Sequence, residues 1–167
     1  NGVAPRVMGV LRPPRLIVTT WPEGSEEWLN APSFPPDVGK GGSRGVPFAR
    51  ELLIEQDDFS VDPPEGYRRL APGLEVRLRY GYVVCYDGHD VDPATGAVTA
   101  VRVTHDSASR GGDAKGRSVA GTIHWVSAAH ALSVELRLYD RLFNVPDPSD
   151  VPEGTDFIAH LNDNSLV

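Results

Sequence analysis

Glycine and proline recur at short intervals along the whole chain, and this spacing constrains the fold more than any other feature. The 167 residues include 17 glycines and 15 prolines, and most of them separate short runs rich in β-branched and aromatic residues. Long helices tolerate neither residue well in their interior, whereas the turns between short strands favour both. The pattern therefore predicts an all-β protein.

Six short runs have the composition of strands. They cover residues 15–20, 49–55, 75–84, 97–105, 118–126 and 132–140. Residues 87–96, DGHDVDPATG, supply the Asp, Pro and Gly that a hairpin connection between the third and fourth runs would use. Residues 31–47 and 106–117 are expected to be loops. One short helix is predicted at residues 155–161, with Thr155 as its N-cap.

Two of these runs alternate apolar and polar residues with the period of a strand. In residues 75–84 this places Arg77 and Arg79 on the same face, pointing away from the core. The inward face would carry Val76, Leu78, Tyr80, Tyr82 and Val84. In residues 132–140 the inward row would be Leu132, Val134, Leu136 and Leu138. Both runs are therefore predicted to be half-buried strands.

The composition places the chain among acidic globular proteins, with a formal net charge of -7. Proteins that coat nucleic acid without sequence preference need broad basic surfaces, so the acidity argues against that class but not against a local basic site. No stretch approaches the ~20 apolar residues of a membrane span, and no secretory signal is evident. The lone Cys85 cannot form an internal disulfide, which fits a reducing compartment. We therefore expect a cytoplasmic protein without membrane contact.

Four arginines nevertheless fall close together, and they follow an acidic run, EQDDFSVDPPE, at residues 55–65. They are Arg68, Arg69, Arg77 and Arg79. Arginine matches phosphate oxygens and base edges and stacks on unpaired bases, and Tyr67 offers further stacking surface. The cluster therefore indicates an anion or RNA site. The alternative is a solvated strand face on which the arginines pair with Glu75 and nearby acids.

Three other patterns fit functional sites less well. The stretch IHWVSAAHA contains His124, Ser127 and His130, but no third metal ligand stands at a telling spacing, and structural histidines beside a buried Trp125 are the alternative. DGHDVDPATG lacks the Gly and the distal Glu of a calcium loop. GKGGSRG lacks the residue order of a phosphate loop, which leaves Arg44 as a minor candidate contact. No metal site is predicted.

Four segments together resemble the C-terminal anticodon-binding region of glutaminyl-tRNA synthetases. They are APRVMGV at 4–10, VPFARELLIEQDDF at 46–59, YRRLAPGLEVRLRYGYVV at 67–84 and GTIHWVSAAHALSVELRLYDRLFNVPDP at 121–148. The phrases HWVSAAHA and RLYDRLF are specific in combination, and the resemblance runs essentially from end to end. A more distant resemblance is to the equivalent region of the archaeal and eukaryotic type of glutamyl-tRNA synthetase.

The resemblance implies two closely packed β-barrels of a type also seen in a ribosomal protein that binds 5S RNA. On this sequence the distal barrel would cover residues 26–122. The proximal barrel would cover residues 1–25 and 123–167. In the family this region continues beyond the NDNSLV with which this sequence stops, so the proximal barrel is expected to be incomplete here.

The resemblance also implies which residues contact RNA. The family's anticodon contacts fall on Arg6 near the middle base, on Arg68 and Arg69 near the third base, and on Arg77 and Arg79 near the first base. Glu65 and Gly66 stand where relatives carry Gln or Lys, so no contact is assigned there. The site residues expected from sequence are therefore these five arginines.

The family's full enzyme joins glutamine to tRNA(Gln) in an ATP-dependent reaction, with Mg²⁺ expected beside ATP. This chain has no HIGH-like or KMSKS-like signature and no dinucleotide-fold pattern, so we expect catalytic residues and both cofactors to lie outside it. Its expected partners are the anticodon loop of tRNA(Gln) and the catalytic domain of the same polypeptide, in a monomer that binds no DNA. Three alternatives stay open: part of a glutamyl-tRNA synthetase, an RNA-binding barrel without a decoding role, and a hydrolase using His124, Ser127 or His130.

Overall fold

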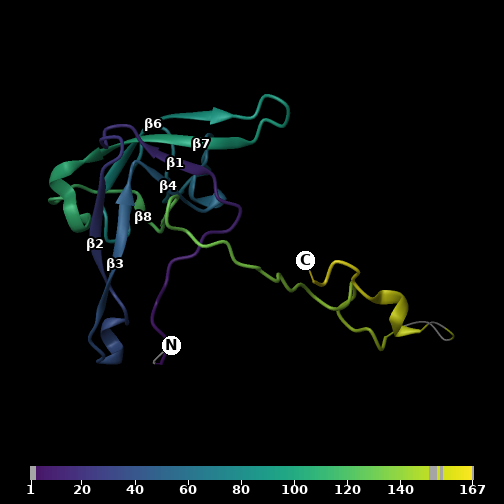
Figure 1. The fold of residues 1–167 in the computed structure, drawn as a ribbon. Coiled ribbons are helices and arrows are strands. Elements are labelled where there is room, and N and C mark those ends of the chain that lie inside the picture. Colours follow the sequence, from purple (N-terminus) through teal and green to yellow (C-terminus); the bar gives the residue numbers. More distant parts are fainter. Residues whose placement is uncertain (1–2, 151–153, 155, 167) are drawn as a thin grey trace. The chain divides into compact units, whose positions relative to one another are not determined.

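The computed structural model describes residues 3–150, 154 and 156–166, and strands and turns dominate them (Figure 1). The strands are β1 (Arg15–Val18), β2 (Glu26–Pro32), β3 (Ser43–Ala49), β4 (Glu51–Leu53), β5 (Glu75–Leu78), β6 (Val83–Val91), β7 (Val98–Asp106), β8 (Gly121–Ile123) and β9 (Val126–Ser127). The short 3-10 helices are η1 (Pro36–Val38), η2 (Gln56–Asp58), η3 (Ser107–Gly112) and η4 (Phe157–His160). The all-β prediction is confirmed. Within the described ranges, no helix has the length and apolar character needed to cross a membrane.

One sheet brings together strands from distant parts of the sequence. Its seven strands lie in the order β8-β5-β6-β7-β1-β4-β9. β1 is parallel to β7 and β5 is parallel to β8, whereas the other neighbours are antiparallel. The segment near the N-terminus is therefore inserted between β7 and β4 and completes the sheet.

A two-stranded ribbon, β2–β3, accompanies this sheet. The two strands pair in antiparallel register from Glu26 opposite Ala49 to Pro32 opposite Ser43. The sequence-based loop at 31–47 was therefore too long, because β3 occupies most of its second half. Gly45 is required in the ribbon, because a Cβ there would lie 2.7 Å from the ring of Trp28 on the paired strand.

The core of this part of the molecule is built around large aromatic side chains. Trp125 and Phe48 are fully buried, and their rings meet edge to face with centroids 5.3 Å apart. Phe48 belongs to β3 and also contacts the ring of Tyr82, which precedes β6, at 5.1 Å. The ribbon is thus packed against the sheet through aromatic contacts, and the predicted burial of Trp125 is confirmed.

Residues 75–84 are a hairpin rather than the single strand predicted from their alternation. β5 ends at Leu78, and the chain reverses through Tyr80, whose φ is 65°, before β6 begins at Val83. The Leu78 N–H donates to the Tyr82 carbonyl at 2.8 Å and closes this turn. Val76, Leu78, Tyr82 and Val84 are all buried as expected, because the four-residue turn preserves the inward alternation on both strands. The shared strand face of Arg77 and Arg79 was therefore wrong, since Arg79 lies in the turn.

The hairpin predicted around residues 87–96 is confirmed, with a shorter connection. β6 continues to Val91 and β7 begins at Val98. The Asp92 side chain accepts from the Ala94 N–H at 2.8 Å, and Gly96 takes a φ of 71°, as the turn residues suggested. In contrast, the single strand predicted at 118–126 is divided into β8 and β9.

The chain separates into two compact units, residues 1–131 and 132–167, each described here by itself. The elements β1 to β9 all belong to the first, which we call unit 1. Because β1 and β9 share one sheet with β5 to β8, segments assigned to the proximal and distal barrels meet in unit 1. The boundaries 1–25 with 123–167, and 26–122, stay a prediction.

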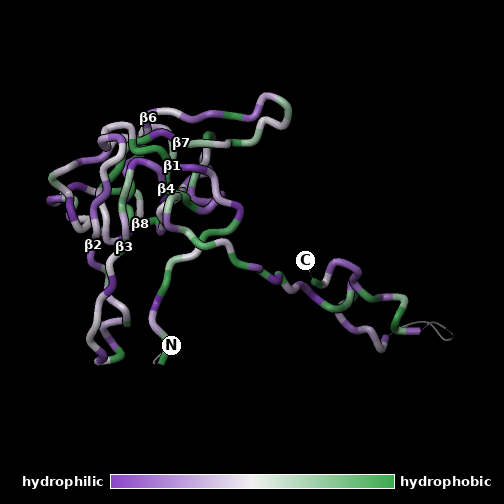
Figure 2. Tube along the Cα trace, in the orientation of Figure 1, coloured by the Kyte–Doolittle hydropathy of each residue, from purple (hydrophilic) through white to green (hydrophobic). Residues whose placement is uncertain are grey.

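Residues 132–167, which we call unit 2, contain no regular strand among those described. The strand predicted at 132–140 was wrong. Three of its four inward residues are open to solvent, with exposed fractions of 88% for Leu132, 77% for Val134 and 53% for Leu136, and Leu138 is half-buried. Figure 2 shows apolar residues of unit 2 in green along its irregular trace. Isolated bridges join Tyr139 to Leu166 and Phe143 to Leu161. Without a continuous neighbouring strand, the alternating residues have no ladder to join.

The predicted short helix near the C-terminus is present as the 3-10 helix η4. Its N-cap is Asp156, whose carboxylate accepts from the Ile158 N–H at 3.0 Å. Thr155, the predicted cap, lies outside the described residues. The helix is shorter than predicted, and the exposure of Phe157 and Ile158 fits a turn without an apolar face packed on a core.

Candidate nucleic-acid interface

Strand β8 brings three of the predicted arginines to one part of unit 1. Arg77 on β5 lies beside Thr122 of β8. The backbone N–H of Arg79 donates to the carbonyl of the last β8 residue at 2.9 Å. A Cβ on Gly121 would overlap the carbonyl oxygen of Arg68, so the backbone of Arg68 passes directly beside this strand. The sequence separates these arginines by up to eleven positions, and the parallel pairing of β5 with β8 gathers them.

Arg77 is held by the protein itself. Its Nε donates to the backbone carbonyl of Gly112, the last residue of η3, and the side chain is partly buried. Gly112 has a φ of 83°, and a Cβ there would lie 2.6 Å from Cδ of Arg77. The glycine is therefore needed both for its backbone conformation and for the close approach of the arginine. Arg77 can meet a ligand only with donors other than Nε.

Arg68 and Arg79 are exposed and are the freer members of the group. The Arg79 guanidinium lies 5.8 Å from the centroid of the Tyr80 ring, a cation–π contact that leaves its N–H donors open. For Arg68, no side-chain hydrogen bond or ion pair occurs within the part of the chain that the structure describes. Two arginines whose backbones lie beside β8 therefore have exposed guanidinium groups that are available to phosphates or base edges.

Arg6 lies elsewhere in unit 1. Its backbone N–H donates to the carbonyl of Ser33, just after β2, at 2.7 Å, and its side chain is exposed. This contact ties the N-terminal segment to the ribbon. Arg6 is thus connected to the ribbon, whereas the backbones of Arg68, Arg77 and Arg79 lie beside β8.

Arg69 pairs with one of the nearby acids, as the alternative interpretation of the cluster expected, although that interpretation did not name Asp58. Its Nη1 forms an ion pair with Oδ1 of Asp58, whose side chain is fully buried while that of Arg69 is 51% exposed. Burial raises the pKa of Asp58 above its ordinary value, although the hydrogen bond and charge of Arg69 act in the opposite direction. The same hydrogen bond raises the pKa of Arg69. The acidic run just before the basic cluster was the available signal for this pair.

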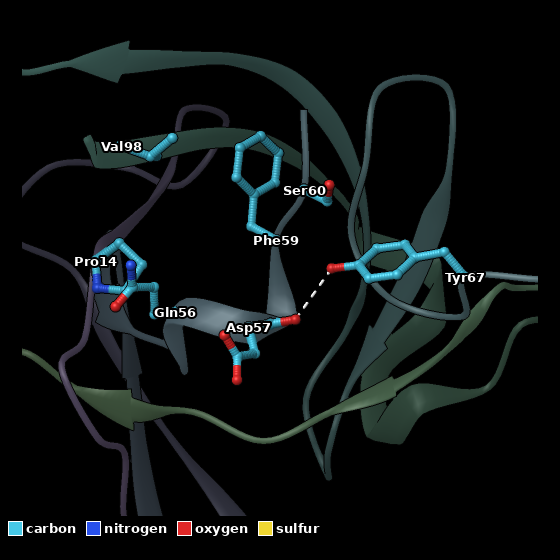
Figure 3. A pocket seen from close by; sticks show the side chains of 7 residues that line it. All are labelled: Pro14, Gln56, Asp57, Phe59, Ser60, Tyr67 and Val98. Carbon is cyan, nitrogen blue, oxygen red and sulfur yellow. Dashed lines mark hydrogen bonds between the residues drawn. The ribbon is translucent and has the colours of Figure 1, made fainter. Parts of the chain in front are cut away.

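A pocket of about 340 Å³ has in its lining both sequence neighbours of Asp58, which are Asp57 and Phe59 (Figure 3). It is lined by Pro14, Gln56, Asp57, Phe59, Ser60, Tyr67 and Val98. The Tyr67 hydroxyl donates to the Asp57 carbonyl at 3.1 Å, which fixes one end of its ring at the pocket wall. Tyr67 was expected as a stacking surface. The other lining residues were not predicted, since they come from the η2 region, from the segment before β1 and from β7.

The residues that suggested a hydrolase lie in separate surroundings. His124 Nε2 is 2.8 Å from the carbonyl oxygen of Gly9, and His130 Nε2 is 2.5 Å from Oε2 of Glu26. Ser127 is 3% exposed, and its Oγ has no hydrogen-bond partner among the described residues. A serine nucleophile requires a hydrogen-bonded base, so this geometry gives the hydrolase hypothesis no support.

The remaining loop patterns are also accounted for by structure. Asp90 forms an ion pair with Arg102 on the neighbouring strand, and Asp92 caps its own turn, as described above. Arg44 donates from Nη1 to the Pro32 carbonyl at 2.9 Å within the ribbon. Throughout the described ranges, no group of three or more His, Cys, Asp or Glu side chains is placed to hold a metal ion.

Comparisons with known proteins agree with the character of this surface. The family described as tRNA synthetases class I (E and Q), anti-codon binding domain, matches residues 4–106, and a second family of the same description matches residues 122–167. The chain is 49% identical to a glutamine–tRNA ligase of Rhodopirellula baltica, 46% to one of Nitrobacter hamburgensis and 44% to one of Pseudomonas putida.

These alignments cover 98% to 100% of the chain but only 28% to 29% of the relatives. The chain thus spans somewhat over a quarter of the length of the curated proteins that it matches. A family match over more than half of the chain, together with the arginines gathered at β8, leads to one conclusion: the chain belongs to the anticodon-binding domain family of the class I tRNA synthetases for glutamate and glutamine.

Proposed function

We propose that the chain is the anticodon-binding part of a glutaminyl-tRNA synthetase and holds the anticodon loop of tRNA(Gln). The observation that carries this proposal is that Arg68 and Arg79, whose backbones lie beside β8, have exposed side chains in a member of this family. The relatives named above are glutamine–tRNA ligases, which favours glutamine over glutamate.

The five arginines would make different kinds of contact with the RNA. Arg68 and Arg79 have open donors for phosphates or base edges, whereas Arg69 and Arg77 are held by Asp58 and by the Gly112 carbonyl. An unpaired base offers its Watson–Crick edge, and a site built to pair with that edge rejects a wrong base, which would leave polar groups unpaired. An arginine whose orientation is fixed by the protein suits recognition of a base edge, and an arginine with a mobile side chain suits a phosphate contact, which needs less exact geometry. Arg6 would add a contact from the ribbon side.

The longer protein would perform the reaction. In this proposal it is a cytoplasmic monomer that joins glutamine to tRNA(Gln), and ATP and Mg²⁺ would bind to its catalytic domain, outside this chain. The division into a distal barrel at 26–122 and a proximal barrel at 1–25 and 123–167 belongs to the same proposal. It is supported by the resemblance, and limited proteolysis of the longer protein would test it.

Filter binding tests the proposed function directly. The protein that contains this chain is titrated against tRNA(Gln) and against variants with one anticodon base changed. Each change should weaken binding by about 1–3 kcal/mol, the usual worth of one specific base contact. Equal binding to all variants would reduce the chain to an RNA-binding module without a decoding role. Tighter binding to tRNA(Glu) than to tRNA(Gln) would move it to the glutamyl enzyme.

A further inference from the structure

Two segments of unit 1 are tied together around Arg69. The Leu70 N–H donates to the Asp58 carbonyl at 3.0 Å, and the Ser60 N–H donates to the Leu70 carbonyl at 3.1 Å. The Tyr67 hydroxyl adds its bond to the Asp57 carbonyl. η2 and residues 67–70 are therefore linked on both sides of Arg69, and the backbone position of this arginine is set by η2.

The side chain of Arg69 is also held, but only at one end. Asp58 is completely buried, and its Oδ1 accepts from Nη1 of Arg69. Its second oxygen, Oδ2, is buried without a hydrogen-bond partner among the described residues. Burying a carboxylate without a full set of hydrogen-bond partners costs folding free energy. Stability alone therefore does not explain why an aspartate occupies this buried position.

The exposed part of the Arg69 side chain suggests a role for Asp58 in ligand binding. A guanidinium has five N–H donors in a planar fork, and Asp58 occupies one of its nitrogens. With the side chain 51% exposed, the remaining donors stay accessible. An anchored fork recognises a planar, hydrogen-bonding ligand at a fixed angle, and less side-chain freedom is lost on binding than for a mobile arginine.

We propose that Asp58 is a positioning residue for RNA recognition: its buried carboxylate orients the Arg69 guanidinium so that the free donors meet one unpaired base. This inference rests on the proposed function and deepens it. A simpler role for Asp58, holding the chain between η2 and residue 70, would stabilise the fold without any connection to base choice. The two roles predict different effects of an Asp58 substitution on RNA binding when the Arg69 side chain has already been removed.

A double-mutant cycle separates these roles. Asp58→Asn, Arg69→Ala and the double variant are compared in the intact protein, by filter binding to tRNA(Gln) and to the three sets of single-base anticodon variants. Arg69→Ala should weaken cognate binding about tenfold and reduce discrimination at one anticodon position. Asp58→Asn should reduce discrimination at that same position, and the double variant should bind no more weakly than Arg69→Ala.

The control is Asp62→Asn, which removes the same charge from the exposed part of the neighbouring loop. It should retain the wild-type binding profile. An Asp58→Asn protein with the wild-type profile would overturn the inference, as would an effect of this change that persists in the Arg69→Ala background. If either result is found while the wild-type protein discriminates between anticodons, the inference is wrong but the proposed function is not. A wild-type protein that does not discriminate removes the proposed function and this inference together.

Arg69→Lys keeps the test decisive if Asp58→Asn does not fold. Lysine preserves a positive charge for the buried carboxylate but has no planar fork. Discrimination at the Arg69 position should fall as it does in Arg69→Ala, while the thermal unfolding temperature stays closer to that of the wild type. A lysine variant that retains full discrimination would show that the orientation of the fork is irrelevant, and the inference would be wrong.

Discussion

Residues 75–84 and 132–140 carry the same alternation of apolar and polar residues, yet they have different structures. In the first, Val76 and Leu78 are fully buried, whereas in the second Leu132 is 88% exposed. β5 has a strand on each side, β6 and β8. Among the described residues of unit 2, the second run makes only an isolated bridge, at Tyr139. Alternation thus identifies the side chains that a strand could bury, and the neighbouring strands decide whether it does.

Truncating one leucine in each run gives the largest expected difference between them. Leu78→Ala should lower the free energy of unfolding of unit 1 by about 2–5 kcal/mol, because it leaves a cavity in a closed core. Leu136→Ala should change it by about 0.5 kcal/mol or less. Urea unfolding followed by tryptophan fluorescence measures both, since all three tryptophans lie in unit 1. Equal losses would show that the 132–140 row is buried in the folded chain.

The second prediction concerns β8, which pairs with β5 and has no counterpart beside the run at 132–140 among the described residues. Gly121→Ala places a methyl group against the Arg68 carbonyl and should cost about 1–3 kcal/mol, because the obstacle is backbone rather than a flexible side chain. Gly41→Ala is the matched control, since a Cβ there has nothing within 4 Å. The same unfolding measurement applies. If Gly121→Ala were as stable as Gly41→Ala, the close contact between Arg68 and β8 would be wrong.

The two runs should also differ in how their arginines affect RNA binding. Arg79 is exposed and its side-chain donors are open, whereas Arg137 pairs with Glu135 at 2.6 Å in unit 2. If Arg79 contacts a phosphate, Arg79→Ala should make the log-log dependence of binding on salt shallower by about 0.7, the value for one contact to a single strand. Arg137→Ala, with the same change of charge, should leave the slope unchanged. An equal shift in both variants would indicate a general effect of net charge.

The smallest effect is spectroscopic and concerns Tyr82 in the first run. Burial and the hydrogen bond that its hydroxyl donates to Glu27 raise the pKa of Tyr82 to about 12. The folded protein favours the neutral phenol, so this stabilisation is complete below the ordinary value of 10.0 and is lost as the pH rises through about 12. Ultraviolet titration should show a late ionisation that Tyr82→Phe removes. A late step that persists in this variant would contradict the assignment.

Several features were predictable because they depend on local sequence. The hairpin at 87–96 follows from Asp92 and Gly96, which carry the side-chain bond and the positive φ that such a turn requires. The burial of Trp125 follows from its size and apolar neighbours. The basic cluster was visible in composition. Its division into held and open arginines was not visible, because the groups that hold Arg69 and Arg77 are Asp58 and a backbone carbonyl 35 residues away.

The errors had a common physical cause. A tight turn with an even number of residues keeps the inward alternation, so the hairpin at 75–84 looks like one strand in sequence. The run at 132–140 has the pattern of a strand without partner strands in its unit. In both cases the side-chain pattern is compatible with more than one backbone path, because it records burial rather than pairing.

The all-β class, the hairpin at 87–96 and the local arginine cluster in an acidic chain could be predicted from the sequence, because turn chemistry and composition act over a few residues. Which arginines are held by other groups and which have open donors depends on the folded structure. That distinction depends on the Gly112 carbonyl of η3 lying beside Arg77 and on Asp58 lying beside Arg69, both of them contacts between segments that meet after folding. Long-range pairing is selected by the joint burial of many residues, and no short stretch contains that information.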